Sequence, residues 1–92
     1  MTIVDILKCA SAGTMESSDA YVEIEPGNGE LCVKIESVVE KQFGEQIQSA
    51  VCDVLKEHGV SDAVVHVVDR GALECVIRAR VETAVMRGKG EA

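Results

Sequence analysis

Residues 21–36, YVEIEPGNGELCVKIE, contain two short alternating runs on either side of a turn sequence. Apolar and acidic side chains alternate in the first run, and Leu31, Val33 and Ile35 fall on one face of the second. Between the runs, the PGNG sequence includes an Asn-Gly pair, which tolerates the positive φ angles that tight turns require. The stretch therefore predicts two antiparallel strands joined as a hairpin.

A long helix is predicted to follow this hairpin and to end near His58. Its apolar side chains recur every four residues, at Val39, Phe43, Ile47, Val51 and Leu55. Ser37 and Glu40 are spaced as a capping box, in which each side chain satisfies a backbone N–H at the start of the helix. Gly59 supplies the left-handed residue that commonly ends a helix.

Two further elements are expected in the C-terminal third of the chain. Residues 63–68, AVVHVV, are rich in β-branched side chains and bounded by polar turn residues, which predicts a third strand. Residues 73–87 fit both a helical repeat and a strand alternation. A helix is favoured because such a length is unusual for a strand, but the strand alternative stays open.

Together these elements predict an α+β fold. We expect a two-layer domain in which a small antiparallel sheet, made of the hairpin and the third strand, packs against a long central helix and a C-terminal helix. Residues 20–87 would form this compact domain. Residues 1–19 would be an N-terminal leader ending in a serine-bearing loop, with a mobile segment of small residues at 10–13. Residues 88–92 would form a loose tail.

The composition restricts the classes of function. Ninety-two residues suffice for one compact domain, and a domain of this size leaves little room for an enclosed catalytic cleft. A formal charge of −7 makes nucleic acids and anionic membrane surfaces unfavourable partners, whereas basic partners are more natural. The charge is uneven, because residues 1–33 contain six acidic groups and one lysine while residues 70–92 contain five basic and three acidic groups.

The sequence shows no sign of export, membrane insertion or metal binding. It lacks a signal-peptide pattern, and no apolar run approaches the roughly 18 residues that a spanning helix needs. A cytoplasmic protein is therefore expected. The four cysteines are spaced 23, 20 and 23 residues apart, with no C-x-x-C motif and no histidine at finger spacing. We expect buried or incidental thiols, with neither a disulfide nor a metal site.

The stretch AGTMESSD at residues 12–19 contains the main candidate for a functional residue, a serine pair between two carboxylates. A serine that another enzyme modifies needs exposure and a flexible backbone rather than a base of its own. Ser17 is expected to have both, because it follows a segment of small residues and precedes a predicted strand. The alternative, in which Thr14, Ser17 and Ser18 only cap a turn, is about equally compatible with the spacing.

Two catalytic interpretations are weaker. A nucleophilic serine needs a base held against it, and the positions of His58 and His66 place neither beside the serine pair. Paired-carboxylate acid/base chemistry has two nominal pairs, Glu23 with Glu25 and Glu16 with Asp19, but needs a pocket that pushes the two pKa values apart. Glu23 and Glu25 share the polar side of an alternating strand, which is typical of a solvated face. We therefore predict no catalytic residue in this chain.

Three separated motifs resemble those of one protein family. They are AGTMESSD followed by an alternating strand, VEKQFGEQI at residues 39–47, and VVDRGALECVIRARVETAVMR at residues 67–87. In this order they resemble the acyl carrier protein, or gamma chain, of bacterial citrate lyase. The resemblance covers about residues 12–87, and Met15 stands where leucine is common in the motif.

The resemblance implies that Ser17 is the attachment point of a covalent prosthetic group, 2′-(5″-phosphoribosyl)-3′-dephospho-coenzyme A, joined through a phosphodiester. The thiol of this arm would carry acetyl and citryl thioesters during the cleavage of citrate to acetate and oxaloacetate. The protein would then be a non-catalytic carrier subunit of a citrate (pro-3S)-lyase complex used in citrate fermentation. Its partners would be the alpha chain (acyl transferase), the beta chain (citryl thioester lyase) and the prosthetic-group transferase.

The residues around Ser17 that match the family motif are expected to be read by the transferase. They are Gly13, Thr14, Glu16, Ser18 and Asp19. An ordinary phosphopantetheine carrier is disfavoured, because its serine begins a helix of an all-helical bundle, whereas Ser17 precedes a predicted strand. The remaining alternative is an acidic protein-interaction module without a prosthetic group.

Overall fold

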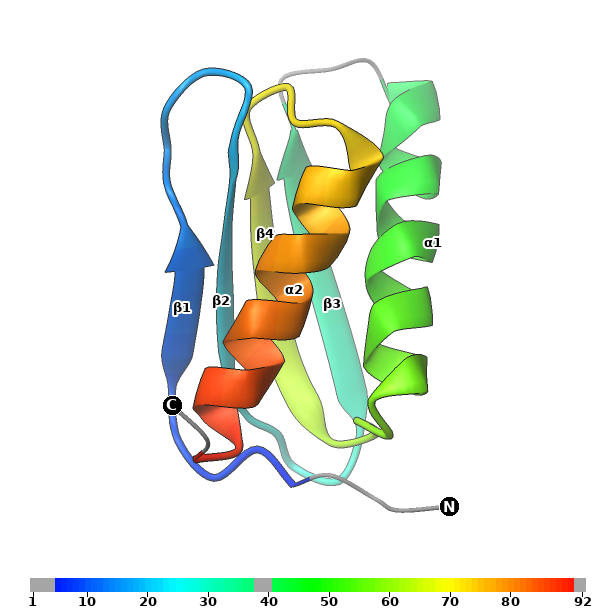
Figure 1. The fold of residues 1–92 in the computed structure, drawn as a ribbon. Coiled ribbons are helices and arrows are strands. Elements are labelled where there is room, and N and C mark those ends of the chain that lie inside the picture. Colours follow the sequence, from blue (N-terminus) through cyan, green and yellow to red (C-terminus); the bar gives the residue numbers. More distant parts are fainter. Residues whose placement is uncertain (1–4, 38–40, 91–92) are drawn as a thin grey trace.

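The computed structural model describes residues 5–37 and 41–90, with the side chains of the second range beginning at residue 45. These residues form a single sheet with both helices on one of its faces (Figure 1). The elements in chain order are β1 (Ala10–Gly13), β2 (Ala20–Pro26), β3 (Leu31–Ser37), α1 (Lys41–Glu57), β4 (Ala63–Asp69) and α2 (Glu74–Gly88). The predicted two-layer α+β fold is confirmed.

The sheet is mixed rather than antiparallel, and its strand order is β1-β2-β4-β3. β2 pairs antiparallel with β1 on one side and with β4 on the other. β3 pairs only with β4 among the described strands, and that pairing is parallel. The hairpin predicted for residues 21–36 is therefore wrong, because β4 lies between its two strands. The hairpin of this fold is β1–β2.

The β2–β3 connection has the length of a hairpin turn but steps across a strand. Alternate strands of a sheet are about 10 Å apart, and four residues can span about 13 Å. Residues 27–30 therefore pass the end of β4, where the Gly29 N–H donates to Asp62 Oδ1 at 2.9 Å. Because β3 and β4 are parallel, the longer connection through α1 joins them.

The core lies between the sheet and the two helices. α1 contacts α2 and β3, and α2 contacts β1 and β2. On β2 and β4, buried side chains alternate with more exposed ones, and the buried ones include Val22, Ile24, Val65 and Val67. This alternation confirms the predicted third strand and places the intervening side chains on the opposite face of the sheet.

The C-terminal segment forms a helix, as favoured from its sequence. The residues that α2 buries follow helical spacing: Ile77, Val81, Ala84, Val85 and Gly88. A strand would instead have buried Cys75 and Ala79 on one face, and both are exposed. Gly88, placed by the sequence in the loose tail, is the buried last residue of this helix.

The N-terminal segment belongs to the sheet, which corrects the prediction of a mobile stretch at residues 10–13. These residues form β1, paired with β2 from Ala10↔Ile24 to Gly13↔Tyr21. Ala12 is buried in the core. Small residues were interpreted as a loop, but here they let α2 lie close over an edge strand. The leader boundary at residue 19 thus falls between two paired strands.

The ends of α1 show one confirmed signal and one that cannot be placed. Gly59 has a φ of 72°, and the Val60 N–H donates to Leu55 O at 2.9 Å, which is the closing bond of a left-handed helix end. The predicted capping box requires Glu40, which lies outside the described residues, as do Val39 and the side chain of Phe43.

Candidate functional site at the β1–β2 loop

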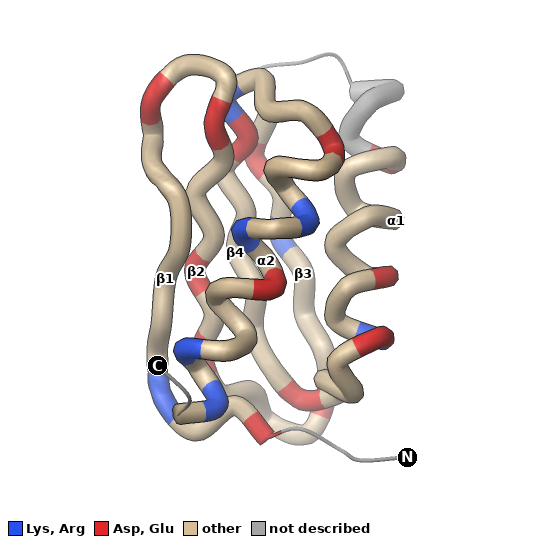
Figure 2. Tube along the Cα trace, in the orientation of Figure 1, with Lys and Arg blue, Asp and Glu red and all other residues tan. Residues whose placement is uncertain are grey.

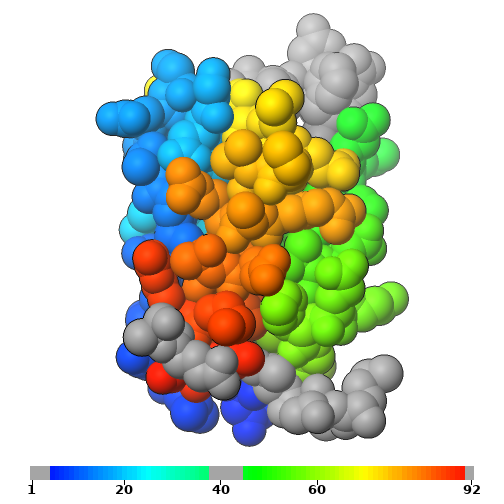
Figure 3. Space-filling view, in the orientation of Figure 1, coloured from blue at the N-terminus to red at the C-terminus, as the bar shows by residue number. Residues whose placement is uncertain are grey.

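The serine pair lies in residues 14–19, the loop that connects β1 to β2 at one end of the sheet. Ser17 and Ser18 occupy its turn, and both are exposed. Figure 3 shows this loop standing at the end of the molecule beside the β4–α2 loop and the start of α2. The structure therefore gives Ser17 the exposure expected from the sequence.

The loop is braced by a hydrogen-bonded network centred on Asp19. Thr14 Oγ1 donates to Asp19 Oδ2 at 2.7 Å and accepts the Glu16 N–H at 3.2 Å. The Ala20 N–H donates to Asp19 Oδ1 at 2.7 Å. From α2, Arg80 donates to both carboxylate oxygens of Asp19, with Nε–Oδ1 and Nη2–Oδ2 distances of 3.0 Å. A bidentate pair of this kind fixes geometry as well as charge.

These contacts lower the pKa of the Asp19 carboxyl from its ordinary value of 3.8 to about 2. The hydrogen bond from Thr14 has the largest effect, followed by those from Arg80 and from the Ala20 N–H. The side chain of Asp19 is only 15% exposed. Asp19 is therefore charged at neutral pH, and its carboxylate is bonded to other residues of the protein, so that little of its side chain is left for an enzyme to contact.

Two residues with positive φ angles, one near each end of the loop, shape its backbone. Ser18 has a φ of 66°, unusual for a residue with a side chain, and the Asp19 N–H donates to Glu16 O at 3.2 Å. Gly13 has a φ of 93°, and a Cβ there would lie 1.9 Å from Ala20 O. The sequence predicted a flexible backbone around Ser17, but the structure shows a defined turn that presents it.

The neighbouring β4–α2 loop is bonded to this turn. The Ser18 N–H donates to Arg70 O and the Arg70 N–H to Asp19 O, each at 2.9 Å, which extends the β2–β4 ladder by one pair. Asp69, only 2% exposed, accepts the N–H groups of Gly71 and Ala72 and the hydroxyl of Ser37. The turn that contains Ser17 thus rests on a second ordered loop.

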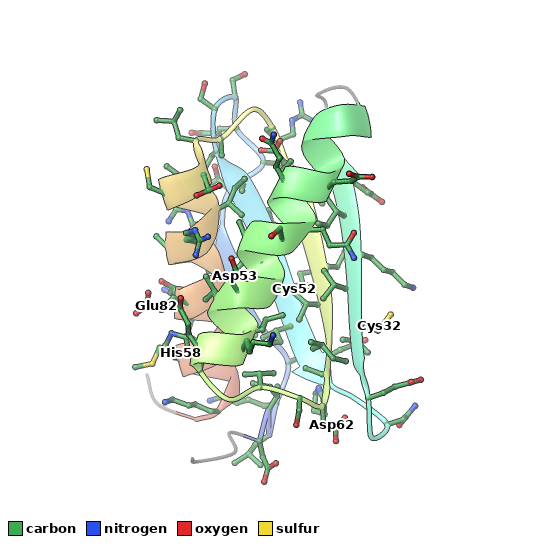
Figure 4. The ribbon with its side chains drawn as sticks, turned by 90° about the vertical axis from the view of Figure 1, so that its right-hand side faces the viewer. Cys32, Cys52, Asp53, His58, Asp62 and Glu82 are labelled. Carbon is green, nitrogen blue, oxygen red and sulfur yellow. The ribbon has the colours of Figure 1, made fainter. Side chains whose placement is uncertain are left out.

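The histidines are not brought to the serine pair. His58 at the end of α1 lies 4.0 Å from Glu82 of α2, and Figure 4 shows the two side chains facing one another. His66 of β4 lies 3.4 Å from Glu36 of β3. A nucleophilic serine needs a base in hydrogen-bond contact. Within the described residues, Ser17 has none.

The carboxylates proposed as an acid/base pair lie on the open face of the sheet. Glu23 and Glu25 are both exposed, while Val22 and Ile24 between them are buried. Across the strands, Glu23 is paired with His66, which borders a shallow hollow of about 650 Å³ on this face. The arrangement is that of a solvated face, in agreement with the sequence-based interpretation.

The four cysteines are free thiols. Cys9, Cys32 and Cys75 are exposed and Cys52 is half-buried, so of the two expected alternatives, buried or incidental thiols, burial does not hold; Figure 4 shows Cys32 on β3 and Cys52 on α1. In the ranges that the structure describes, no group of three His, Cys, Asp or Glu side chains could hold a metal ion. No helix within those ranges is long and apolar enough to cross a membrane.

Comparison with known proteins identifies the family. Residues 8–88 match the family described as the malonate decarboxylase delta subunit (MdcD), a family of acyl carrier proteins (ACP). A relative from Pectobacterium atrosepticum is 55% identical over 82 residues, which cover 89% of this chain and 85% of the relative, and it is named citrate lyase acyl carrier protein. The chain belongs to the citrate lyase acyl carrier proteins.

Other matches agree with this membership. A citrate lyase acyl carrier protein from Latilactobacillus sakei is 44% identical over 88 residues, covering 96% of this chain and 87% of the relative. The crystal structure of a Pseudomonas malonate decarboxylase hetero-tetramer in complex with malonate contains a chain of the same fold. It superposes with a TM-score of 0.80 and 22% identity, and covers 94% of this chain and 89% of that one.

Two residues next to the serine turn of this chain were not found from the sequence. Arg80, which fixes Asp19, stands 61 residues along the chain from it, and Arg70 bonds the turn through its backbone. The available signal for Arg80 was one of several charged residues in the predicted C-terminal helix. That signal names no partner, since Arg78, on the same helix, pairs with Glu74 and Asp53 instead.

Proposed function

We propose that this chain is the acyl carrier subunit of a bacterial citrate lyase, with 2′-(5″-phosphoribosyl)-3′-dephospho-coenzyme A joined to Ser17 through a phosphodiester. The observation that supports this most is the exposed Ser17 on a braced turn of a chain that belongs to the citrate lyase acyl carrier proteins. When attached, the arm supplies a thiol that holds acetyl and citryl groups as thioesters.

The residues present fit such an attachment. A phosphodiester on Ser17 Oγ requires a hydroxyl that projects into solvent and that another enzyme's base can deprotonate, and Ser17 is exposed with no internal base. The Ser17 oxygen would lose its proton to that base and form a bond to a phosphorus of the precursor, while the bond from that phosphorus to the precursor's leaving group breaks. The Asp19–Arg80 contact holds the turn in place while this enzyme binds.

The division of work in the complex follows from this design. The carrier supplies the attachment point and the reach, while the alpha chain would transfer the acyl group and the beta chain would cleave the citryl thioester. Tethering keeps the thioester at a high local concentration near both partners, provided that the arm spans their sites. A cytoplasmic location, where citrate is fermented, is part of the same proposal.

The five motif residues around Ser17 divide into two groups by their contacts. Gly13, Thr14 and Asp19 serve the turn itself, through its backbone angle and the bonds to Asp19. Glu16 and Ser18 are exposed on the turn. We therefore propose that the transferase reads Glu16 and Ser18 directly and requires the other three for the shape of the turn.

The attachment site can be tested by intact mass. The chain, incubated with the cognate prosthetic-group transferase and its precursor, should gain the mass of the arm. Ser17→Ala should gain nothing. Ser18→Gly is the matched control for the site, because glycine removes the adjacent hydroxyl yet favours the positive φ of 66° at this position. It should gain the same final mass as the unsubstituted chain, but more slowly, since the transferase is proposed to read Ser18.

The outcomes separate the proposal from its rival. If the Ser17→Ala variant gained the mass of the arm, the attachment site would be a residue other than Ser17. No gain of mass, with a transferase that modifies another citrate lyase carrier in the same reaction, would exclude the carrier function. An acidic interaction module without a prosthetic group would then remain, with the exposed Glu23 and Glu25 of the open sheet face as its docking surface.

A recognition role for Glu16 predicts a separate result. Glu16→Ala should slow the modification of Ser17 while leaving the unfolding midpoint unchanged, because the side chain is exposed on the turn. Rates of modification measured by mass at subsaturating transferase, with Glu23→Ala as the control of equal charge change, test this. Equal rates for the two variants would show that Glu16 is not read.

A further inference from the structure

The four arginines of this chain differ in what their guanidinium groups contact. Arg78 is engaged by Glu74 and Asp53, Arg80 by Asp19, and Arg87 donates to Ser11 O at 2.8 Å. Arg70 is exposed, and the structure gives its guanidinium no hydrogen-bond or ion-pair partner within residues 5–37 and 45–90. An arginine beside a functional loop without an acidic partner is available to a ligand.

Arg70 is fixed next to Ser17 by its own backbone. Its carbonyl accepts the Ser18 N–H and its N–H donates to Asp19 O, both at 2.9 Å. The following residue, Gly71, is held through its N–H by the buried carboxylate of Asp69. The backbone of Arg70 is therefore fixed on both sides. Its side chain begins directly across from Ser18 and Asp19, next to the turn that presents Ser17.

The acidic residues around the turn would repel a phosphoryl group on Ser17, and a nearby cation would offset this repulsion. Residues 12–19 contain Glu16 and Asp19, the whole chain has a formal charge of −7, and Figure 2 shows acidic residues in this loop. Arg80 uses two of its five N–H donors on the oxygens of Asp19, so that carboxylate already balances its charge. A phosphoryl group placed on Ser17 would be repelled by Glu16 unless another cation faced it.

We propose that Arg70 is a phosphate-binding residue, whose guanidinium pairs with the phosphoryl group esterified to Ser17. Arginine suits this role because its planar donors match two oxygens of a phosphate at once. The pairing would hold the first phosphate of the arm against the β4–α2 loop and so fix the direction in which the arm leaves the protein. This inference rests on the proposed attachment at Ser17.

The pairing can be tested without the transferase. The full chain is produced with phosphoserine in place of Ser17 by genetic-code expansion, and the second pKa of the phosphate, ordinarily about 6, is measured by ³¹P NMR titration. A nearby guanidinium favours the dianion and lowers this pKa. Arg70→Gln should therefore raise the pKa by about half a unit or more, close to a threefold change in the dissociation constant.

The matched control removes the same charge elsewhere. Arg87→Gln lies at the opposite end of α2 from the serine turn (Figure 1) and should leave the phosphate pKa unchanged. Arg70→Lys, which keeps the charge but not the planar donors, should retain most of the shift. Equal pKa values for the unsubstituted chain and Arg70→Gln, or an equal rise with Arg87→Gln, would overturn the pairing.

This test fails independently of the function proposed above. If Ser17 gains the arm but Arg70→Gln leaves the phosphate pKa unchanged, the carrier function stands and the pairing is wrong. If Ser17 does not gain the arm, the mass experiment reports it, whatever the phosphoserine titration shows.

Discussion

Asp19 and Asp69 stand at the same end of the sheet, each holding one of the two loops that meet there, yet they do so by different means. Asp69 is buried and accepts only neutral donors, from Ser37, Gly71 and Ala72. Asp19 is partly exposed and meets the guanidinium of Arg80. One loop closes mainly on its own backbone, whereas the other is fastened to a helix far away in the sequence.

The difference matches what each loop has to do. A loop closed by a buried carboxylate is a rigid part of the core, because opening it would leave polar groups unpaired inside the protein. A loop that is held by an ion pair to a neighbouring helix can stay ordered while the residues of its turn remain in solvent. The supporting loop is built in the first way and the turn that presents Ser17 in the second.

The largest effect is expected where the serine turn meets the sheet. Gly13→Ala would place a Cβ 1.9 Å from Ala20 O at a φ of 93°, so the hairpin must shift. We expect the free energy of unfolding to fall by about 4 kcal/mol, measured by urea denaturation.

Gly71 in the supporting loop is the matched control for Gly13. It has the same φ of 93°, but nothing lies within 4 Å of a Cβ there. Gly71→Ala should therefore cost only the backbone strain, about 1 to 2 kcal/mol. Equal losses for the two variants would mean that the crowding at Gly13 relaxes at no cost.

The second effect concerns the buried carboxylate of the supporting loop. Asp69→Ala leaves the N–H groups of Gly71 and Ala72 and the hydroxyl of Ser37 without their acceptor, so we expect a loss of about 3 kcal/mol in the free energy of unfolding. Asp69→Asn keeps one acceptor oxygen and should lose about 1 kcal/mol. Urea titrations compare the variants, and an Asp69→Ala protein as stable as Asp69→Asn would contradict this account.

The third effect separates the bonds that hold Asp19. Carboxyl ¹³C NMR titration should give the Asp19 pKa of about 2, against an ordinary 3.8. Thr14→Val should raise this pKa because it removes the hydrogen bond with the largest effect, and Arg80→Gln should raise it because it removes both a charge-assisted bond and a charge. Arg78→Gln removes an equal charge two residues earlier on α2 and should leave the Asp19 pKa unchanged. An unchanged Asp19 pKa in Thr14→Val or Arg80→Gln would contradict the assigned causes.

The same pKa fixes a pH dependence. Since the folded-state pKa of Asp19 is depressed, the stabilisation that Asp19 provides is complete above its ordinary pKa of 3.8 and is lost as the pH falls towards about 2. The unfolding midpoints of the unsubstituted chain and Asp19→Asn should therefore differ at pH 5 and converge as the pH approaches 2. If the difference between the two unfolding midpoints stayed the same down to pH 2, it would not arise from ionisation of the Asp19 carboxyl.

The smallest effect is expected away from both loops. Glu23→Gln removes a charge that projects into solvent from the open sheet face, so neither the unfolding midpoint nor the attachment of the arm to Ser17 should change. The same two assays apply. Loss of attachment in this variant would show that the open face, as well as the serine turn, takes part in recognition by the transferase.

Local patterns were enough to predict most elements of the fold. The alternation around Val65 and Val67 identified β4, and helical spacing identified both helices, because these signals lie within a few residues of one another. The pairing of β2 with β3 was predicted wrongly, since a four-residue connection has the same local sequence whether it turns back or steps over a strand. Only the position of β4, thirty residues later, decides between them.

The candidate site was predictable in identity but not in construction. The motif around Ser17 marked the loop, whereas the sequence positions of the histidines gave no indication that either reaches it. The bracing by Arg80 and the backbone bonds to Arg70 join segments more than fifty residues apart, and no local periodicity reports such contacts. The sequence predicted a flexible loop without these bonds in view, because the bonds that hold the turn are long-range.

The bond between the Leu7 N–H and Gly88 O, 2.9 Å long, has a practical consequence for labelling. It ties the two ends of the described chain together beside the turn of residues 27–30, at the pole of the molecule opposite to Ser17 (Figure 1). An affinity handle or fluorophore placed next to the Leu7–Gly88 bond would therefore lie at the pole away from the serine turn. A chain trimmed to these two residues could also be closed by a short linker and opened at residues 27–30, which would leave the serine turn unchanged.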